Sequence, residues 1–525
     1  MRKQSHLRPF VVGLIGHREL SEQELPRLQS EFDGYIEKLL RILPNTPILV
    51  LTSIAEGADR LAHSSKFRNQ IKICAVLPME KKEYAKDFMT KSSLRSFRNA
   101  VQESDHVYGL KNRHTRSWTT QNSRNKAYAE CGRWISDKSN ALFVVWDGRD
   151  SRGVGGTSDS VKHRQKSLSV PAHLLRGGLS LTHVFASNAG SKVLEDCNCG
   201  GHSGISARDQ IELLEFDRLN FHLRDSKIIE IDSSLDVDFQ IFDQEAITLQ
   251  RMFIKRTKIV LTLGVMFVNL SSLHVDQLTY QTLAPALLAL LTTFLVWKRL
   301  MSSRIKSAYE TFRLMAEVIR VQIWWRSCGV KDDVLSQIPE FREVESSARL
   351  FIANTFLTNE IEGESRSSRI SSYDNPNDWI ANQVAYLGTS NAPGAIAKNE
   401  RKSSRLKNLI FVSLSVSGAS LLMGTILASF GVRVDLVQQT TSILFTFSLS
   451  LAAAIAAFSQ VMSFKEIANR FKIKEFRLRK ALLSLESTRK DSNSLEIARE
   501  VGIDSLSEAF KWFQVKSEKQ VRPFQ

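Results

Sequence analysis

This sequence has few cysteines, and their arrangement excludes a disulfide framework. Among its 525 residues there are 5 cysteines, at positions 74, 131, 197, 199 and 328. Disulfide scaffolds carry more cysteines in a much shorter chain. Cys197, Cys199 and His202 stand close together among glycines, but no second cysteine pair follows at zinc-ribbon spacing. We therefore expect a flexible loop at this place and no metal ion in the protein.

Charged residues are absent from four apolar segments in the C-terminal two-thirds of the chain. These segments are Ile259–Val275, Gln281–Trp297, Leu409–Val432 and Thr441–Phe464. At about 1.5 Å of rise per residue, the last two are long enough for a bilayer core of about 30 Å, whereas the first two are marginal. We expect four transmembrane helices, paired as two hairpins, in an all-α membrane domain.

Basic residues flank both pairs of apolar segments and are scarce within each pair. The stretches 255–258, 298–306, 401–407 and 465–474 each contain three or four lysines and arginines, and the hairpin tips, 276–280 and 433–440, contain one arginine between them. The positive-inside rule then places every long polar region in the cytoplasm. We expect a multi-pass protein of the inner (cytoplasmic) membrane with cytoplasmic N- and C-termini.

The net charge has a simple explanation in this arrangement. A formal net charge of +16 and a pI near 9.6 would indicate nucleic-acid binding in a soluble protein. Here the charge lies beside the apolar segments, so anionic lipid is the expected partner and nucleic acid is not. A basic nucleic-acid binder held at the membrane stays as a third hypothesis.

The first 165 residues alternate between short apolar runs and helical periodicity. Strands are expected at 9–15, 47–52, 71–77 and 141–146, with helices at Glu22–Leu43 and Gly57–Lys66. This alternation predicts an α/β Rossmann-like domain with a parallel sheet. A flexible linker is expected over 166–208, with one short strand near Leu181–Ala186. The expected sequel is a first hairpin region at 209–330, a cytoplasmic helical region at 331–407, and a second hairpin with C-terminal helices at 408–525.

Glycine and polar residues follow the expected strands, where the ligand crevice of an open parallel sheet lies. Glycines allow backbone N–H groups to approach an anion, and a helix N-terminus adds its dipole. We predict a nucleotide-binding site here, although the glycines are also explained if they only make tight turns. The candidate residues are Gly13, Gly16, Arg18, Ser53, Glu56, Gly57, Asp59, Asp147, Gly148, Gly155, Gly156 and Thr157.

The motifs GLIGHREL, LTSIAEGADRLA and AVLP, a segment with Tyr84, Asp87 and Phe88, and the motifs FVVWDG and GVGGTSDSV resemble, in this order, the SLOG superfamily. This superfamily contains Rossmann-like nucleotide-binding domains related to the cytokinin-activating LOG enzymes and DNA-processing protein A. The resemblance implies that Gly16 and Arg18 contact a nucleotide and that Gly155, Gly156 and Thr157 cradle a phosphate. It implies no covalently bound cofactor, and it does not name the nucleotide.

One position departs from the LOG pattern. LOG enzymes have a glutamate three residues after the threonine of their phosphate motif, and this chain has Ser160, next to Asp159. A serine does not supply the negative charge that a hydrolase needs there. The departure favours ligand sensing over hydrolysis, and we assign no catalytic residue. The alternative is a membrane-tethered nucleotide hydrolase of LOG-like type that uses Glu56, Asp59 or Asp159.

The hairpins, together with the phrase FRLMAEVIRVQIWW at 312–325, resemble the SLATT membrane effector domains of bacterial conflict systems. The resemblance implies an oligomeric effector that perturbs the inner membrane in antiviral defence when a nucleotide-derived ligand is sensed. Arg313, Glu317 and Arg320 in this phrase are spaced for ion pairs along one helix. We expect Trp324 and Trp325 to lie in a core or a subunit interface.

Overall fold

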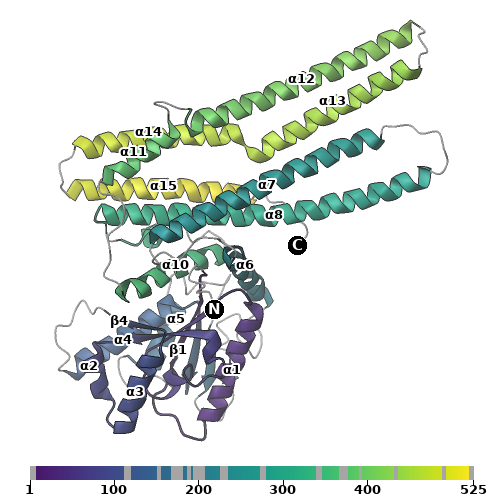
Figure 1. Cartoon of the computed structure of the whole chain (residues 1–525). Helices are drawn as coiled ribbons and strands as arrows, with labels where there is room; N and C mark the ends of the chain where they lie inside the picture. The colour runs from purple at the N-terminus through teal and green to yellow at the C-terminus, as the bar shows by residue number, and fades with distance from the viewer. Residues whose placement is uncertain are drawn as a thin grey trace. The chain divides into compact units, whose positions relative to one another are not determined.

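The protein is described here by a computed structural model (Figure 1). The described residues are 7–110, 120–149, 155–166, 181–185, 191–192, 207–224, 235–271, 280–330, 332–337, 346–365, 376–388, 393–430, 435–487 and 492–518. The chain divides into two compact units. The sheet unit comprises Met1–Phe242 and Ile338–Ile370, and the helical unit comprises Asp243–Gln337 and Ser371–Gln525. Cys197, Cys199 and His202 lie outside the described residues.

A seven-stranded sheet forms the centre of the sheet unit, with the strand order β4-β3-β2-β1-β5-β6-β7. All neighbouring strands pair in parallel except β6 and β7, which pair antiparallel at one edge. The parallel α/β prediction is therefore confirmed. The strands are β1 (Phe10–Gly16), β2 (Ile48–Thr52), β3 (Ile71–Leu77), β4 (His106–Gly109), β5 (Ala141–Trp146), β6 (Leu181–Phe185) and β7 (Ser191–Lys192).

Two of these strands extend what the sequence indicated. β6 is the short strand expected near Leu181–Ala186, and it pairs with β5, so the sheet continues past residue 165. β4 was not expected. Its four residues include only one that is buried, Tyr108, so it has no apolar run to reveal it.

Helices cover both faces of the sheet (Figure 1). Phe143 of β5 contacts Phe32 of α1 (Leu25–Ile42) at a ring distance of 5.2 Å. The next residue, Val144, packs in a cluster with Ile135 of α4 (Gln121–Lys138). Since successive side chains of a strand point to opposite faces, α1 and α4 lie on opposite sides of the sheet.

The remaining elements of the sheet unit are short or lie late in the chain. The prediction of a helix over Gly57–Lys66 was wrong: the structure has a single 3-10 turn, η1 (Gly57–Arg60), which is followed by non-helical turns. Gly57 itself has a left-handed φ of 76° and therefore lies outside the helical region. The others are η2 (Arg68–Gln70), η3 (Ala85–Asp87), α2 (Lys81–Tyr84), α3 (Lys91–Glu103), α5 (Thr157–Lys166), α6 (Ala207–Arg224) and α10 (Ser346–Ser365).

A buried pair of amides attaches α10 to the sheet. The side chains of Asn140 and Asn354 exchange two hydrogen bonds, of 3.0 and 2.8 Å. Asn354 also donates to the backbone oxygen of Pro9, and the Asn140 side chain accepts from the backbone N–H of Val11. Both asparagines are buried, so each lost bond would leave a polar group unsatisfied. α10 falls in the range 331–407 but belongs to the sheet unit.

We predict that Asn354→Ala lowers the free energy of unfolding by about 1–3 kcal/mol, because it leaves Asn140 and the Pro9 carbonyl without their partner. Thermal unfolding of the full chain in neutral detergent measures the change. Asn469→Ala, at an exposed position of α14, is the control and should leave the melting temperature unchanged. Equal melting temperatures for the two variants would contradict the role of the amide pair.

Among the described residues, the helical unit contains most of α7 (Leu235–Ser271), from Asp243 onward, and seven further helices. They are α8 (Tyr280–Ser327), α9 (Val334–Gln337), α11 (Pro376–Leu387), α12 (Ala395–Ser429), α13 (Asp435–Met462), α14 (Phe464–Ser487) and α15 (Ser492–Glu518). Trp324 and Trp325 of α8 are fully buried, as expected for core residues. Trp324 stacks on Trp379 of α11, with ring centroids 4.5 Å apart, and Trp325 donates to the carbonyl of Ala498 in α15.

Two segments of the described residues are long and apolar enough to cross a membrane, not the four expected. They are Ala395–Ser429 and Gln439–Leu485. The two segments of the first hairpin, Ile259–Val275 and Gln281–Trp297, are not among them. These segments are shorter than those of the second hairpin, and Val275 lies outside the described residues.

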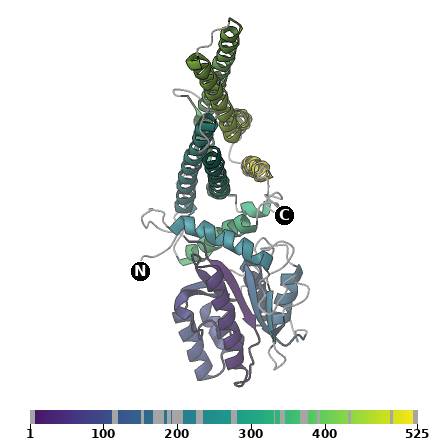
Figure 2. The same ribbon diagram turned by 90° about the vertical axis from the view of Figure 1, so that its right-hand side faces the viewer.

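The second hairpin leaves its apolar side chains uncovered. α12 and α13 lie side by side in both views (Figures 1 and 2). Ser417 of α12 faces the partner helix, with its hydroxyl 3.4 Å from the Phe445 carbonyl. Phe411 is 72% exposed, and Leu422 is 63% exposed. Small polar residues inside and large apolar residues outside are typical of helices that pack together in lipid.

Candidate functional site

The turns after β1 and β2 are packed against each other through two glycines. A Cβ at Gly57 would lie 2.3 Å from the carbonyl oxygen of His17, and one at Gly16 would lie 2.5 Å from the Cβ of Ala58. The backbone N–H of Ala58 donates to the His17 carbonyl at 3.1 Å. These two glycines therefore allow the close approach of two protein segments. This packing brings Arg18, after β1, close to Asp59, after β2.

Asp59 is a buried carboxyl group in this edge of the sheet. Its side chain is 5% exposed and accepts a hydrogen bond from the hydroxyl of Ser53. Burial raises the pKa of Asp59 to about 6, although Ser53 and the charge of Arg18 favour the ionised form. Near neutral pH this group can therefore change between a hydrogen-bond donor and an acceptor.

An aromatic and charged wall lies beside Arg18. Its guanidinium sits 4.8 Å from the ring centroid of Tyr128, a cation–π contact. The Tyr128 hydroxyl donates to Asp87, which also pairs with Arg124. The Tyr84 hydroxyl donates to the Ser53 carbonyl at 3.2 Å. This wall holds Arg18 at the carboxyl ends of β1 and β2.

Sequence reasoning did not assign Tyr84, Asp87, Arg124 or Tyr128 to the site. Tyr84 and Asp87 belong to a segment that carries the resemblance, but no glycine there marked them as binding residues. Arg124 and Tyr128 are four residues apart in α4, and this helical spacing is the one signal that they share a face.

The glycine-rich turn before α5 reaches the same wall. Gly155 has a φ of 95°, and a Cβ there would lie 3.1 Å from the Cβ of Tyr128. Gly156 and Thr157 follow at the N-terminus of the ten-residue α5, where free backbone N–H groups and the helix dipole favour an anion. Arg18 and this N-terminus thus both lie against Tyr128.

Ser160, at the position of the LOG glutamate, supplies no carboxylate to this turn. A Cβ at Gly132 of α4 would lie 2.2 Å from the hydroxyl of Ser160, so Ser160 packs against α4. Asp159 accepts a hydrogen bond from the backbone N–H of Gly155 at 2.8 Å and thereby closes its own turn.

The other candidate residues have separate places. Asp147 follows β5, and its backbone N–H donates to Nε2 of His17 at 3.0 Å. This bond joins the turn after β1 to the turn after β5. Gly148 is the next residue of that turn. Glu56 accepts from the Ser93 hydroxyl of α3. Gly13 lies in the middle of β1, where a Cβ would meet the Leu142 side chain at 2.7 Å, so it is a packing residue away from the edge.

Neither a metal site nor a known relative adds to this picture. No group of three His, Cys, Asp or Glu side chains in the described ranges is arranged to hold a metal ion. Comparison of the chain with protein-family models, curated proteins and solved structures found no match.

We predict that Gly57→Ala lowers the free energy of unfolding by about 1–3 kcal/mol, because the new Cβ meets the His17 carbonyl and the left-handed φ disfavours alanine. Gly34→Ala is the matched control, since no described atom lies within 4 Å of its Cβ position in α1. Helix propensity should make that variant neutral or more stable. Thermal unfolding of both variants separates them, and equal losses would contradict the packing argument.

Asp59 should give the protein a distinctive pH dependence. Between about pH 4 and about pH 6 the folded state keeps a proton on Asp59 that the unfolded chain has lost, so stability falls as the pH rises. Each unit of pKa difference corresponds to about 1.4 kcal/mol. We expect this fall in wild type and its absence in Asp59→Asn, measured by melting temperature across this range. Parallel profiles would show that the carboxyl is not buried as described.

Proposed function

We propose that the protein is a membrane-bound effector that senses a nucleotide-derived ligand through a Rossmann-like, SLOG-like domain. The observation that carries the proposal is the presence, in one chain, of an anion-receptive sheet edge and of two apolar helices of membrane length. In the proposed complex, Arg18 and the N–H groups at Gly156 and Thr157 receive the phosphate. Asp59 binds a hydroxyl of the sugar.

The membrane part of the proposal goes further than the two helices. The apolar ends of α7 and α8 are proposed to cross the bilayer as well, which gives four helices in two hairpins. The basic residues beside all four place both termini in the cytoplasm at the inner membrane. Several copies assemble, because four short helices are too few to enclose a pore. The biological setting, antiviral defence by membrane disruption, rests on the resemblance to SLOG and SLATT proteins alone.

A LOG-like nucleotide hydrolase is the second candidate. One observation favours it: the pKa of Asp59 near 6 suits a general acid or base. Three observations weigh against it. Ser160 packs against α4, Asp159 is bonded to Gly155, and Glu56 is bonded to Ser93. The sensor is therefore the better supported function.

A nucleotide panel tested on the full chain in neutral detergent distinguishes the two. A ligand at a hundred times its Kd adds about 2.7 kcal/mol of stability, and analysis of the recovered nucleotide shows whether it was cleaved. We expect one nucleotide to stabilise wild type and to be recovered intact.

Arg18→Ala should abolish the stabilisation, and Arg41→Ala, at an exposed position of α1, should preserve it. Cleavage would establish the hydrolase. Stabilisation that survives Arg18→Ala, or no stabilisation by any nucleotide, would overturn the proposed site.

A further inference from the structure

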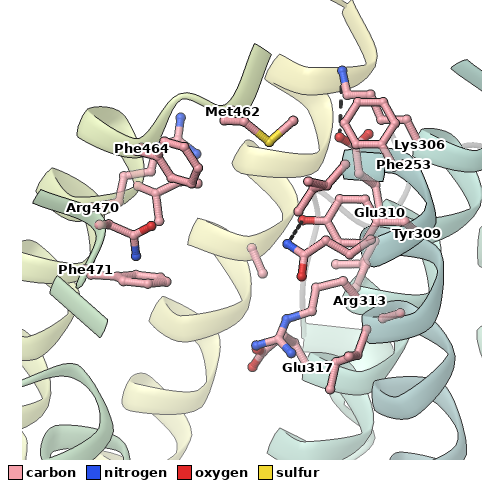
Figure 3. Close-up of a pocket in the computed structure, with 18 of the residues that line it drawn as sticks. Phe253, Lys306, Tyr309, Glu310, Arg313, Glu317, Met462, Phe464, Arg470 and Phe471 are labelled. Atoms are coloured by element: carbon pink, nitrogen blue, oxygen red, sulfur yellow. Dashed lines mark hydrogen bonds and ion pairs between the residues drawn. The ribbon is translucent and has the colours of Figure 1, made fainter. Parts of the chain in front are cut away.

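A stripe of charged residues runs along α8 in the helical unit. Lys306, Glu310, Arg313, Glu317 and Arg320 follow at intervals of three or four residues, so they share one face. Between Arg313 and Arg320, the other residues of α8 are buried apolar side chains. Figure 3 shows the first four of these charged residues on one side of a cavity, with Met462, Phe464, Arg470 and Phe471 across from them.

The acidic residues of the stripe already have partners. Arg313 pairs with Asp243 of α7 at 2.6 Å and with Glu317 at 2.9 Å, and Arg320 pairs with Glu317 at 3.1 Å. Burial alone would raise the pKa of Glu317, but Arg320, Lys474 and Arg313 outweigh it and lower the pKa to about 2. The Glu317 carboxylate therefore stays ionised and is neutralised within the wall.

The cavity keeps an excess of positive charge. It has a volume of about 940 Å³ and is lined by eight lysines and arginines but only four aspartates and glutamates. In the part of the chain that the structure describes, no carboxylate forms an ion pair with Lys258, Lys402 or Arg405, which line it. A cavity of this charge is expected to hold an anion.

Two of these cations, Lys258 and Lys402, lie beside two aromatic rings that also line the cavity. The Lys258 ammonium lies 5.9 Å from the ring centroid of Phe458, and the Lys402 ammonium lies 5.4 Å from that of Phe464. The two ring centroids are 6.4 Å apart. Lys258 immediately precedes the apolar run of α7, and Arg405 comes one turn before that of α12. Lys258 and Arg405 thus mark where these helices become apolar.

The joint between α13 and α14 borders the cavity as well. Ser463 separates the two helices with a φ of 50°, in the left-handed region. Its neighbours on both sides, Met462 and Phe464, line the cavity. A ligand at this joint would contact the last residue of an apolar helix and the first residue of a polar one.

We infer that this cavity binds a phosphate-bearing ligand, held by Lys258, Lys402 and Arg405 beside the Phe458–Phe464 pair. A phosphate offers the oxygens that a guanidinium fork and ammonium groups bind together. Two sources supply it: the headgroup of an anionic phospholipid, or a soluble phosphate compound. The inference does not depend on the nucleotide site of the sheet unit.

Binding to the full chain in neutral detergent micelles tests the inference. The probes are short-chain phosphatidylglycerol mixed into the micelles, with phosphatidylcholine as its uncharged counterpart, and sodium pyrophosphate. All proteins carry Arg18→Ala, so the sheet unit does not contribute. Lys402→Gln with Arg405→Gln removes two charges that line the cavity. Arg401→Gln with Lys407→Gln removes two exposed charges of the same helix that do not line it.

We expect the cavity variant to bind the phosphate probe at least about tenfold more weakly than the parent protein, which carries Arg18→Ala alone, because charge-assisted hydrogen bonds are lost. The control variant should bind like this parent protein. Binding of phosphatidylglycerol alone identifies a lipid headgroup, and binding of pyrophosphate identifies a soluble source. Equal losses in the two double variants, or no binding to the parent protein, would overturn the inference.

Discussion

The buried contact between Arg8 and Asp238 is the constraint on which the sheet unit depends. Arg8 lies two residues before the start of β1, and Asp238 lies in the first turn of α7; both are buried. Burial raises the pKa of Asp238, while Arg8 favours its ionised form. A charged pair in such a place is costly to desolvate and is strongly destabilising when one partner is lost. Two neighbours stabilise the Arg8–Asp238 pair. Asn359 donates a hydrogen bond to Asp238, and the Phe242 ring lies 5.5 Å from the Arg8 guanidinium.

This contact joins the two features that the proposed function needs. β1 has Arg8 before its first residue and Arg18 just after its last, so one short strand links the buried ion pair to the candidate site. α7 has Asp238 near its start and continues as one helix to Ser271, inside the first apolar segment. α7 therefore begins at the ion pair in the sheet unit and ends within the first apolar segment.

The sequence predicted those parts of the fold that depend on residues close together in the chain. Local patterns were sufficient for β1, β2, β3 and β5, because buried parallel strands are continuous apolar runs. They were also sufficient for the Arg313–Glu317–Arg320 pairs, which need only helical spacing. The Asn140–Asn354 pair joins residues more than 200 positions apart, and no local pattern marks either asparagine.

The candidate site shows the same division. Glycines and charged residues after the strands pointed to one edge of the sheet, since parallel strands all end there, and the structure brings several of them together at that edge. The structure gives Gly16 and Gly57 a packing role, which the motif alone did not distinguish from phosphate binding. Tyr128 was missed because its contact with Arg18 arises only when α4 folds onto the sheet. The cavity of the helical unit was missed because its charges come from several helices and from both hairpin regions.

Ser463 has a consequence for the length of the last apolar helix. A left-handed residue other than glycine costs about 1–2 kcal/mol. That is no more than a few good side-chain contacts contribute, so the packing around this joint is sufficient to hold it. Because of this residue, α13 and α14 are separate helices and not one straight rod from Asp435 to Ser487. The backbone conformation of one serine thus sets where the apolar helix ends and the polar helix begins.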